Sequence, residues 1–423
     1  MLKIINLRAG EELPGPSPVA LDDDVLAGTR AIIERVRSEG DAALVALTRE
    51  FDGADIAGRI ALDDDELDSA AGELDPALRD ALDRMADRLR AFHARQLPLA
   101  WDAERDGVRY GEIVKPLSAA GCYVPGGRAS YPSTVLMTVI PARVAGVERV
   151  VVTTPCDENT DVPPAVRYAA RVAEVDAVFR VGGAQAIAAL AYGTESVPRV
   201  DKVVGPGNVW VTAAKALLVG TVGIDSLAGP SELVIIADAN ADPAALAVDL
   251  VAQAEHDPMA RAVLVTTDGS LAAAVADRLA DEVMASPRRE IVETAMAHGS
   301  IVIARDETEA AAVIDSIAPE HLQIVTADPP ATLSRVRAYG AAFLGSSTPV
   351  SFGDYGVGSN HVLPTMGNAR FASGLRAADF VTISSFTEAS PEGAATLGPE
   401  IEAVAEAEGL PAHARASRIR RSP

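Results

Sequence analysis

The segment Glu232-Leu-Val-Ile-Ile236 is a continuous apolar run, followed by a helical pattern from Asp242 to Glu255 and a second apolar run, Ala262-Val-Leu-Val-Thr266. In the central pattern, apolar residues recur at helical spacing after Asp242-Pro243, an N-cap followed by a first-turn proline. Apolar strands joined by one helix of this length are typical of a parallel sheet covered on both faces. This segment therefore predicts an α/β fold.

The same alternation extends in both directions from this segment. Further apolar runs that predict strands are Val150-Val-Val-Thr153, Ala177-Val-Phe-Arg-Val181, Lys202-Val-Val204, Ser300-Ile-Val-Ile303 and Gln323-Ile-Val325. Residues 21–93 have helical periodicity instead, and a change of domain is expected near Gly229-Pro230-Ser231. From about Phe371 the chain holds one strand candidate and a helix around Glu400 to Glu408. A tail this short has no core of its own, so we expect it to dock, most simply on a second copy of the chain.

Composition restricts the class of protein. The 423 residues include 37 Lys and Arg against 60 Asp and Glu, a net charge of −23, which would repel nucleic acid and anionic membranes. A surface this acidic also has a simpler reading, because it keeps a protein in solution. The two cysteines, Cys122 and Cys156, form no CxxC motif, so a metal would need nitrogen and oxygen ligands. No signal peptide or long apolar span is present, and we expect a cytoplasmic protein.

Four of the six histidines, His256, His321, His361 and His413, stand beside carboxylates, amides or glycines. Gln253 and His256 are three residues apart at the end of a predicted helix, a spacing that suits two ligands of one metal. A histidine that only caps the helix C-terminus is the alternative. Imidazole and carboxylate are groups that bind zinc and move protons near neutral pH. We therefore interpret these positions as one composite active site.

Two further segments carry groups of this kind. Glu320-His321 lies between a predicted helix and a predicted strand, where a carboxylate and an imidazole could serve two proton transfers. A solvated glutamate beside a histidine that begins a strand is the alternative. The segment from Ser351 to His361 has three glycines in eleven residues and includes Asp354, so we predict a functional loop that approaches a ligand closely.

Glycine-rich turns could bind a nucleotide. Tyr123-Val-Pro-Gly-Gly127, Val181-Gly-Gly-Ala-Gln185 and Gly205-Pro-Gly-Asn208 are three such turns, and the last two lie between a predicted strand and a predicted helix. Backbone amides and the helix dipole favour phosphate at such places. None of the turns matches G-x-G-x-x-G, so the pattern alone is weak evidence for a dinucleotide.

Taken together, these segments resemble the histidinol dehydrogenase family along nearly the whole chain. The resemblance is carried by Gly121-Cys-Tyr-Val-Pro-Gly-Gly127, Pro132-Ser-Thr-Val-Leu-Met137, Val181-Gly-Gly-Ala-Gln185, Gly205-Pro-Gly-Asn208, Gly229-Pro-Ser-Glu232, Gln253-Ala-Glu-His256, Pro319-Glu-His-Leu322 and Gly358-Ser-Asn-His-Val-Leu-Pro-Thr365. It implies a zinc-dependent enzyme that oxidises L-histidinol to L-histidine through a bound aldehyde, with two NAD and one water, in the last step of histidine biosynthesis.

The resemblance also implies roles for individual residues. Glu320 and His321 match the catalytic acid/base pair. The zinc ligands would be Gln253, His256, Asp354 and His413, one ion per subunit. Substrate contacts would be Ser231, Gln253, His256, His321, Asp354, His361, Glu408 and His413, and cofactor contacts Tyr123, Gln185 and Asn208. His413 and Glu408 would come from the partner subunit of a homodimer. No cysteine nucleophile is then required, and Cys122 is expected to serve packing.

The family's architecture implies two incomplete Rossmann-like domains and intertwined arms. It divides the chain into an N-terminal arm (1–21), a first domain in two parts (22–122 and 231–375, the second with the zinc and catalytic residues), an inserted domain on the cofactor side (123–230) and a C-terminal arm that docks on the partner (376–423). Three alternatives stay open: a related zinc and NAD dehydrogenase of another small hydroxy compound, a zinc hydrolase, and a non-catalytic scaffold.

Overall fold

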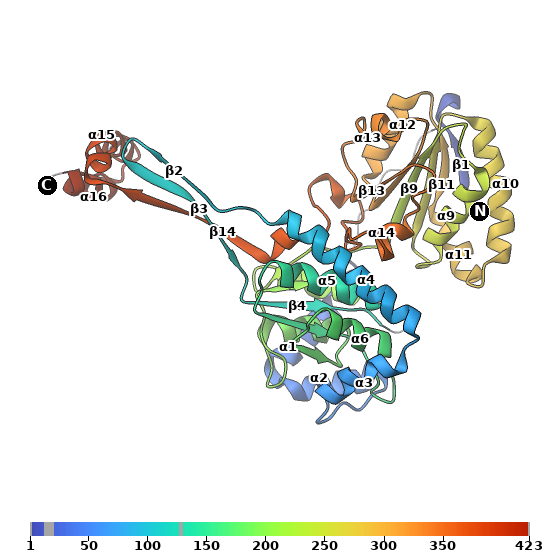
Figure 1. The fold of residues 1–423 in the computed structure, drawn as a ribbon, viewed down its shortest axis with the longest axis horizontal. Coiled ribbons are helices and arrows are strands. Elements are labelled where there is room, and N and C mark those ends of the chain that lie inside the picture. Colours follow the sequence, from blue (N-terminus) through green and yellow to red (C-terminus); the bar gives the residue numbers. More distant parts are fainter. Residues whose placement is uncertain (1, 12–20, 127–129, 422–423) are drawn as a thin grey trace.

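A computed structural model describes residues 2–11, 21–126 and 130–421. Residues 1 and 12–20 of the expected N-terminal arm therefore lie outside the described residues, as does Gly127 of the turn that begins at Tyr123. The chain forms two lobes, each built on a parallel sheet, and a long arm that projects away from both (Figure 1). The predicted α/β fold is confirmed.

One lobe, the six-stranded lobe, has the strand order β1-β11-β10-β9-β12-β13, with all neighbours parallel. Four of its strands are the predicted apolar runs, whereas the two edge strands, β1 and β13, were not predicted. The strands are β1 (Lys3–Asn6), β9 (Glu232–Ala237), β10 (Arg261–Thr266), β11 (Ser300–Ile303), β12 (His321–Val325) and β13 (Ala341–Leu344). The helices are α9 (Pro243–Ala254), α10 (Gly269–Ala285), α11 (Arg289–Ala295), α12 (Glu307–Ile317), α13 (Pro329–Leu333) and α14 (Ser351–Tyr355).

Side-chain alternation divides this sheet between two helical layers. Leu233 and Ile235 of β9 pack with α9 and α10, whereas Leu322 and Ile324 of β12 pack with α12 on the other face. In the β9–β12 register His321 lies opposite Leu233. His321 therefore points toward the α9 layer, as does Gln323 two residues later.

The five-stranded lobe has the order β6-β5-β4-β7-β8, also all parallel. Its strands are β4 (Ala119–Tyr123), β5 (Arg149–Thr153), β6 (Ala177–Phe179), β7 (Lys202–Val204) and β8 (Gly223–Ile224). The helices that follow them are α5 (Pro132–Val144), α6 (Pro164–Val172), α7 (Gly183–Tyr192) and α8 (Val209–Leu218).

The helical segment of residues 22–122 belongs with this second sheet. It folds as α1 (Asp23–Glu39), α2 (Asp41–Asp52), α3 (Asp64–Glu73) and α4 (Pro76–His93), in agreement with the predicted helices. We expected this range to share a domain with residues 231–375. Instead, the apolar faces of α1 to α4 share one hydrophobic core with β4 to β8, because residues such as Leu44 and Leu89 are fully buried there.

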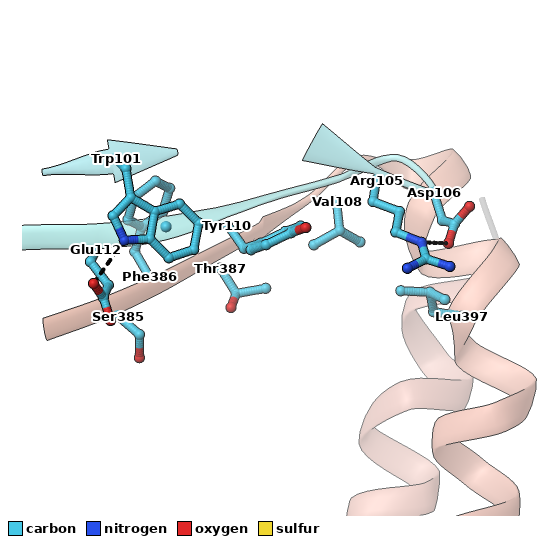
Figure 2. Close-up of a pocket in the computed structure, with 11 residues that line it drawn as sticks. Trp101, Arg105, Asp106, Val108, Tyr110, Glu112, Ser385, Phe386, Thr387 and Leu397 are labelled. Atoms are coloured by element: carbon cyan, nitrogen blue, oxygen red, sulfur yellow. Dashed lines mark hydrogen bonds and ion pairs between the residues drawn. The ribbon is translucent and has the colours of Figure 1, made fainter. Parts of the chain in front are cut away.

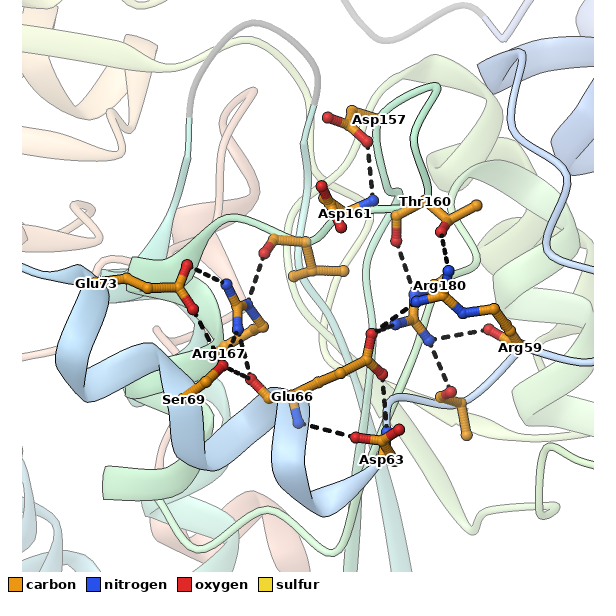
Figure 3. A network of polar contacts seen from close by, with 12 residues as sticks. Arg59, Asp63, Glu66, Ser69, Glu73, Asp157, Thr160, Asp161, Arg167 and Arg180 are labelled. Carbon is orange, nitrogen blue, oxygen red and sulfur yellow. Dashed lines mark hydrogen bonds and ion pairs between the residues drawn. The ribbon is translucent and has the colours of Figure 1, made fainter.

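A buried arginine fastens α3 to this lobe (Figure 3). Arg180, 1% exposed, donates to the carbonyls of Thr160, Arg59 and Ala61 at 2.8, 3.0 and 2.7 Å and pairs with Glu66 of α3. Burial opposes ionisation of Glu66, but hydrogen bonds from Arg180 and from the Asp63 amide outweigh it and lower the pKa of Glu66. This carboxylate is therefore stabilised in its charged form.

The arm is an antiparallel three-stranded sheet with two helices at its tip (Figure 1). It consists of β2 (Trp101–Arg105), β3 (Val108–Pro116), β14 (Val381–Ala389), α15 (Pro391–Ala407) and α16 (Pro411–Arg421), in the strand order β14-β3-β2. The strand and helix predicted for the tail are present, whereas β2 and β3 were not predicted. In the described ranges, no helix combines the length and the apolar character needed to cross a membrane.

Candidate active site

Three of the predicted polar residues, Ser231, Glu320 and His321, meet at the amino edge of the six-stranded sheet. Ser231 directly precedes β9, Glu320 directly precedes β12, and β9 and β12 are parallel neighbours. Ser231 Oγ donates to Glu320 Oε2 at 2.6 Å, and the Glu232 amide donates to the same oxygen at 3.0 Å. The turn from α12 into β12 passes through Ala318 with φ +50°, and after it Glu320 Oε2 lies 3.5 Å from His321 Nδ1.

Glu320 is buried, 6% exposed, which contradicts the reading of a solvated glutamate. Burial raises the pKa of Glu320 to about 7, while the hydrogen bonds from Ser231 and from the Glu232 amide act in the opposite direction. A carboxyl group with this pKa exchanges a proton readily at neutral pH. Such a group suits general acid/base catalysis.

The hydrogen bonds of His321 define its tautomer. Nδ1 lies 3.2 Å from the carbonyl oxygen of Glu232, so Nδ1 carries the proton and donates it to that oxygen. Burial lowers the pKa of His321 and favours the neutral ring. Nε2 is then a free base, buried and without a hydrogen-bond partner among the residues that the structure describes, 3.9 Å from Asp354 Oδ1.

Three of the predicted metal ligands lie on α9, directly after it, and on α14. Gln253 occupies the last turn of α9, buried at 3% exposure, and its Nε2 has no partner in the described part of the chain. His256 follows the helix end with an exposed side chain, although enough protein surrounds it that desolvation lowers its pKa. Asp354 has its pKa raised to about 6 by burial, with His321 acting in the opposite direction.

Asp354 lies on a short helix, so the predicted loop is wrong over Ser351–Tyr355. The amides of Gly353 and Asp354 bond back to the carbonyl of Val350 at 2.8 and 3.3 Å, which closes one helical turn. A Cβ on Gly353 would lie 2.6 Å from the Phe343 ring, so glycine allows this helix to pack against the sheet. The Phe343 ring in turn lies 6.0 Å from the ring of His321.

His361 ends the glycine-rich segment and reaches the other lobe. Its amide contacts Met137 Sδ at 3.0 Å and its Nε2 lies 3.4 Å from Ser133 Oγ, both on α5. Burial lowers the pKa of His361 to about 4, so the ring is neutral. The preceding Asn360 side chain donates to the Met137 carbonyl at 2.6 Å. This segment therefore connects the two lobes beside the candidate site.

Glu408 and His413 lie apart from all these residues. Both are exposed on the two helices at the tip of the arm, which projects away from both lobes (Figure 1). Among the described residues of a single chain, no three His, Cys, Asp or Glu side chains are close enough to hold a metal ion. The predicted ligand set therefore does not assemble within one chain.

The predicted cofactor residues lie at the carboxyl edge of the five-stranded sheet. Tyr123 ends β4, Gln185 lies in the first turn of α7 and Asn208 is the N-cap of α8. The Tyr123 hydroxyl accepts from the Gly183 amide at 3.2 Å, and burial raises its pKa to about 12. In the strand order β4 is the point where the connections reverse direction, the usual position of a ligand crevice in such sheets.

Asn208 already has a local role. Its Oδ1 accepts from the amides of Trp210 and Val211 at 3.1 and 3.2 Å and so caps α8, while the side chain stays exposed. Only its Nδ2 is left for a ligand. The two cysteines are unsuited to nucleophilic catalysis, because burial raises the pKa of Cys122 to about 12 and that of Cys156 to about 11.

The sequence did not single out the side chain of Glu232. It is 8% exposed, accepts from the Met366 amide at 2.9 Å, and burial raises its pKa to about 7. The only sequence signal was a carboxylate at the start of an otherwise apolar strand, next to Ser231.

Comparison with known proteins gives a consistent result. A sequence model of the family described as histidinol dehydrogenase matches residues 17–421. A histidinol dehydrogenase of a Synechococcus species is 46% identical over 428 residues, 99% of each chain. That of Natronomonas pharaonis is 49% identical over 394 residues, 93% of this chain and 92% of its own. The crystal structure of histidinol dehydrogenase from Elizabethkingia anophelis superposes with a TM-score of 0.94 at 33% identity, covering 99% of this chain and 98% of its own.

Proposed function

Because the chain belongs to the histidinol dehydrogenase family and is thus an NAD-dependent oxidoreductase, we propose that it oxidises L-histidinol to L-histidine, the final step of histidine biosynthesis. Two hydrides pass in succession to two NAD, and one water supplies the second carboxylate oxygen of the product. L-Histidinaldehyde stays bound between the two steps. The observation that carries this proposal is the buried pair of Glu320 and His321, two proton acceptors 3.5 Å apart.

His321 acts in both oxidations as a proton acceptor. Its Nε2 is bare, because Nδ1 is committed to the Glu232 carbonyl, and it takes the hydroxyl proton of histidinol as the hydride leaves carbon. The low pKa of the buried ring keeps this nitrogen unprotonated at neutral pH. As water adds to the aldehyde, His321 returns this proton to the aldehyde oxygen, and Nε2, bare again, then accepts a proton from a hydroxyl of the hydrate.

Glu320 acts between the two oxidations. With a pKa of about 7 it is substantially ionised at neutral pH, and it accepts a proton from the water that attacks the aldehyde carbon. Ser231 and the Glu232 amide hold one carboxylate oxygen by hydrogen bonds, which leaves the other oxygen for the water.

A zinc ion suits the residues beside this pair. We propose Gln253, His256 and Asp354 as its ligands together with His413 of the partner subunit, a set of nitrogen and oxygen donors. The buried Gln253 carboxamide with its unpartnered Nε2 supports a ligand at this place. When bound, the ion would hold and orient the substrate through its amine and imidazole nitrogens. Ser231, His361 and the partner's Glu408 are proposed to complete the contacts to histidinol.

For NAD we propose the carboxyl edge of the five-stranded sheet, with Tyr123, Gln185 and Asn208 as contacts. The amino ends of α7 and α8 point to this edge and favour an anionic pyrophosphate. His361, which contacts α5 of this lobe, links the two proposed sites.

The exposed arm supports the proposal of a homodimer. Trp101, Tyr110 and Phe386 line a hollow of about 480 Å³ on its sheet, with Leu397 of α15 at one end (Figure 2). Trp101 is 48% exposed, and contact of this apolar surface with water is unfavourable in a monomer. We propose that the arm docks on a second copy and delivers His413 and Glu408 to that copy's site.

Two experiments test this function. The first counts NADH per histidine formed from histidinol before and after chelation of zinc, with an expected ratio of two and loss of activity after chelation. One NADH with release of free aldehyde would contradict the role of Glu320, and activity without NAD would favour a hydrolase.

The second experiment mixes inactive His413→Ala and His256→Ala chains under conditions where dimers exchange. Partial activity is expected, because one site of each heterodimer is intact. No recovery in exchanged dimers would contradict a shared site.

A further inference from the structure

A second row of polar side chains lies behind the proposed metal site. Gln323, 2% exposed, is two residues beyond His321 on the same face of β12, and Asp249 is one helical turn before Gln253 on the same face of α9. Gln323 Nε2 donates to Asp249 Oδ2 at 2.7 Å. The surroundings are apolar, since Leu246, Leu250 and Ile235 belong to the buried core of this layer. A polar pair in such a layer costs stability unless all of its polar atoms are hydrogen-bonded.

Two polar atoms of this row of side chains have no hydrogen-bond partner in the described part of the chain. Among the described residues, Gln253 Nε2 lacks an acceptor, and Gln323 Oε1 lacks a donor. Asp249 is bonded to Gln323 through Oδ2, and a carboxylate oxygen pair can accept further hydrogen bonds. The nearest helical neighbour with a free donor is Gln253, at position i+4.

A carboxamide has two ends with opposite properties. Its oxygen can bind a cation, whereas its NH₂ group cannot, so a glutamine ligand works only when its NH₂ group is held elsewhere. We propose that Asp249 is a positioning residue: it accepts from Gln323 Nε2 with one oxygen and from Gln253 Nε2 with the other, and so turns Gln253 Oε1 toward the ion. This inference rests on the proposed zinc site and adds a residue that does not touch the ion.

The decisive variant is Asp249→Asn, which keeps the volume but replaces one acceptor by a donor. The asparagine oxygen would satisfy Gln323, and its NH₂ group would attract Gln253 Oε1 away from the ion. We expect zinc affinity to fall about 10- to 100-fold, the usual effect of losing an outer-shell partner. Affinity is measured on the stripped full-length dimer by competition with a chromophoric chelator, alongside the melting temperature without metal.

Two further variants separate positioning from simple structural support. Asp249→Ala removes the acceptor without adding a donor, so positioning predicts zinc binding at least as strong as in Asp249→Asn, even if the alanine variant melts lower. Asp315→Asn is the matched control: this half-buried α12 carboxylate only accepts from the amides of Arg337 and Ala338, at 2.7 and 3.1 Å, and its loss should leave zinc affinity unchanged.

A coupling experiment covers the case in which Asp249→Asn is unstable. The Gln253→Glu side chain can only accept hydrogen bonds, so the Asp249 carboxylate repels it, whereas the NH₂ group of an asparagine at this position donates to it. Gln253→Glu should therefore improve zinc binding more in the Asp249→Asn background than in the wild type. Equal zinc affinity of wild type and Asp249→Asn, or equal effects of Gln253→Glu in both backgrounds, would overturn the inference. A wild-type protein that binds no zinc at this site would instead refute the proposed function.

Discussion

The two parallel sheets of this chain carry their candidate functional residues at opposite edges. On the five-stranded sheet these residues follow the strands, where the amino ends of α7 and α8 present backbone N–H groups. On the six-stranded sheet they precede the strands, beside the carboxyl end of α9. A helix amino end favours anions and a carboxyl end favours cations. The two edges therefore favour ligands of opposite charge.

The edges also differ in how their polar groups are satisfied. The side chains of Asn208 and Tyr123 already accept hydrogen bonds from backbone amides. In contrast, His321 Nε2 and Gln253 Nε2 are buried without partners among the described residues, next to carboxyl groups of raised pKa. Unsatisfied buried groups cost stability and are kept where chemistry needs them. We therefore expect substitutions at the six-stranded edge to change chemistry, and substitutions at the five-stranded edge to change affinity.

The largest effect is expected for Glu320→Gln. The variant keeps the hydrogen bond from Ser231 but cannot accept a proton from water, so formation of the acid should slow by about 10²- to 10⁴-fold. The first hydride transfer, measured as a single-turnover burst of NADH, should persist, and a trapping reagent should detect the aldehyde. Wild-type acid formation should rise with pH through about 7 as Glu320 ionises, and the variant should lack this rise.

The matched comparison is Glu232→Gln, which neutralises a neighbouring buried carboxyl group. It should still yield two NADH per histidinol. A full second NADH from Glu320→Gln at the wild-type rate would show that the six-stranded edge does not supply the base.

These edges could be located from the sequence to different extents. Glu320 and His321 were identifiable because they sit where a helical pattern ends and an apolar strand begins, and the structure has that junction. The burial of Glu232 was not identifiable, because it depends on the Thr365–Met366 segment, which is 134 residues away where Met366 bonds to it. The strands β2 and β3 escaped prediction because both faces of the arm are largely exposed and leave little apolar alternation. Periodicity predicts that α1 to α4 have apolar faces, but it does not indicate which of the two sheets these faces pack against. Their packing on the five-stranded sheet could therefore not be predicted.

The next largest effect is expected on the pH dependence of folding stability, through Glu232. Burial holds the pKa of Glu232 at about 7, above its ordinary value of 4.5, so the folded protein binds this proton more tightly than the unfolded chain. Stability is therefore lost as pH rises from about 4.5 through 7, by at most about 3 kcal/mol. Glu232→Gln removes this loss, because the amide oxygen still accepts from Met366. The metal-free variant should melt above the wild type at pH 8 and equally at pH 5.

Glu66 is the control, because its effect on the pH dependence of folding stability is expected to have the opposite sign. Its pKa is lowered in spite of burial, because Arg180 and the Asp63 amide bind the charged form, so its contribution to stability is present above the ordinary pKa and is lost as pH falls. Glu66→Gln should thus melt below the wild type at pH 8. If both variants shifted in the same direction, the contrast between a buried carboxyl group of raised pKa and one held in its charged form by Arg180 would fail.

The smallest effect is expected at the five-stranded edge, where Asn208 both caps α8 and is proposed to contact NAD. Asn208→Asp keeps an oxygen acceptor for the Trp210 and Val211 amides, so the melting temperature should change little. It removes the Nδ2 donor and adds a negative charge beside an anionic cofactor, so the KM for NAD should rise several-fold with kcat nearly constant, since the loss is one of binding rather than of chemistry. Asn208→Ala loses the cap as well and should lower stability by about 1 kcal/mol. An unchanged KM in Asn208→Asp would leave Asn208 as a helix cap alone and move the phosphate site away from α8.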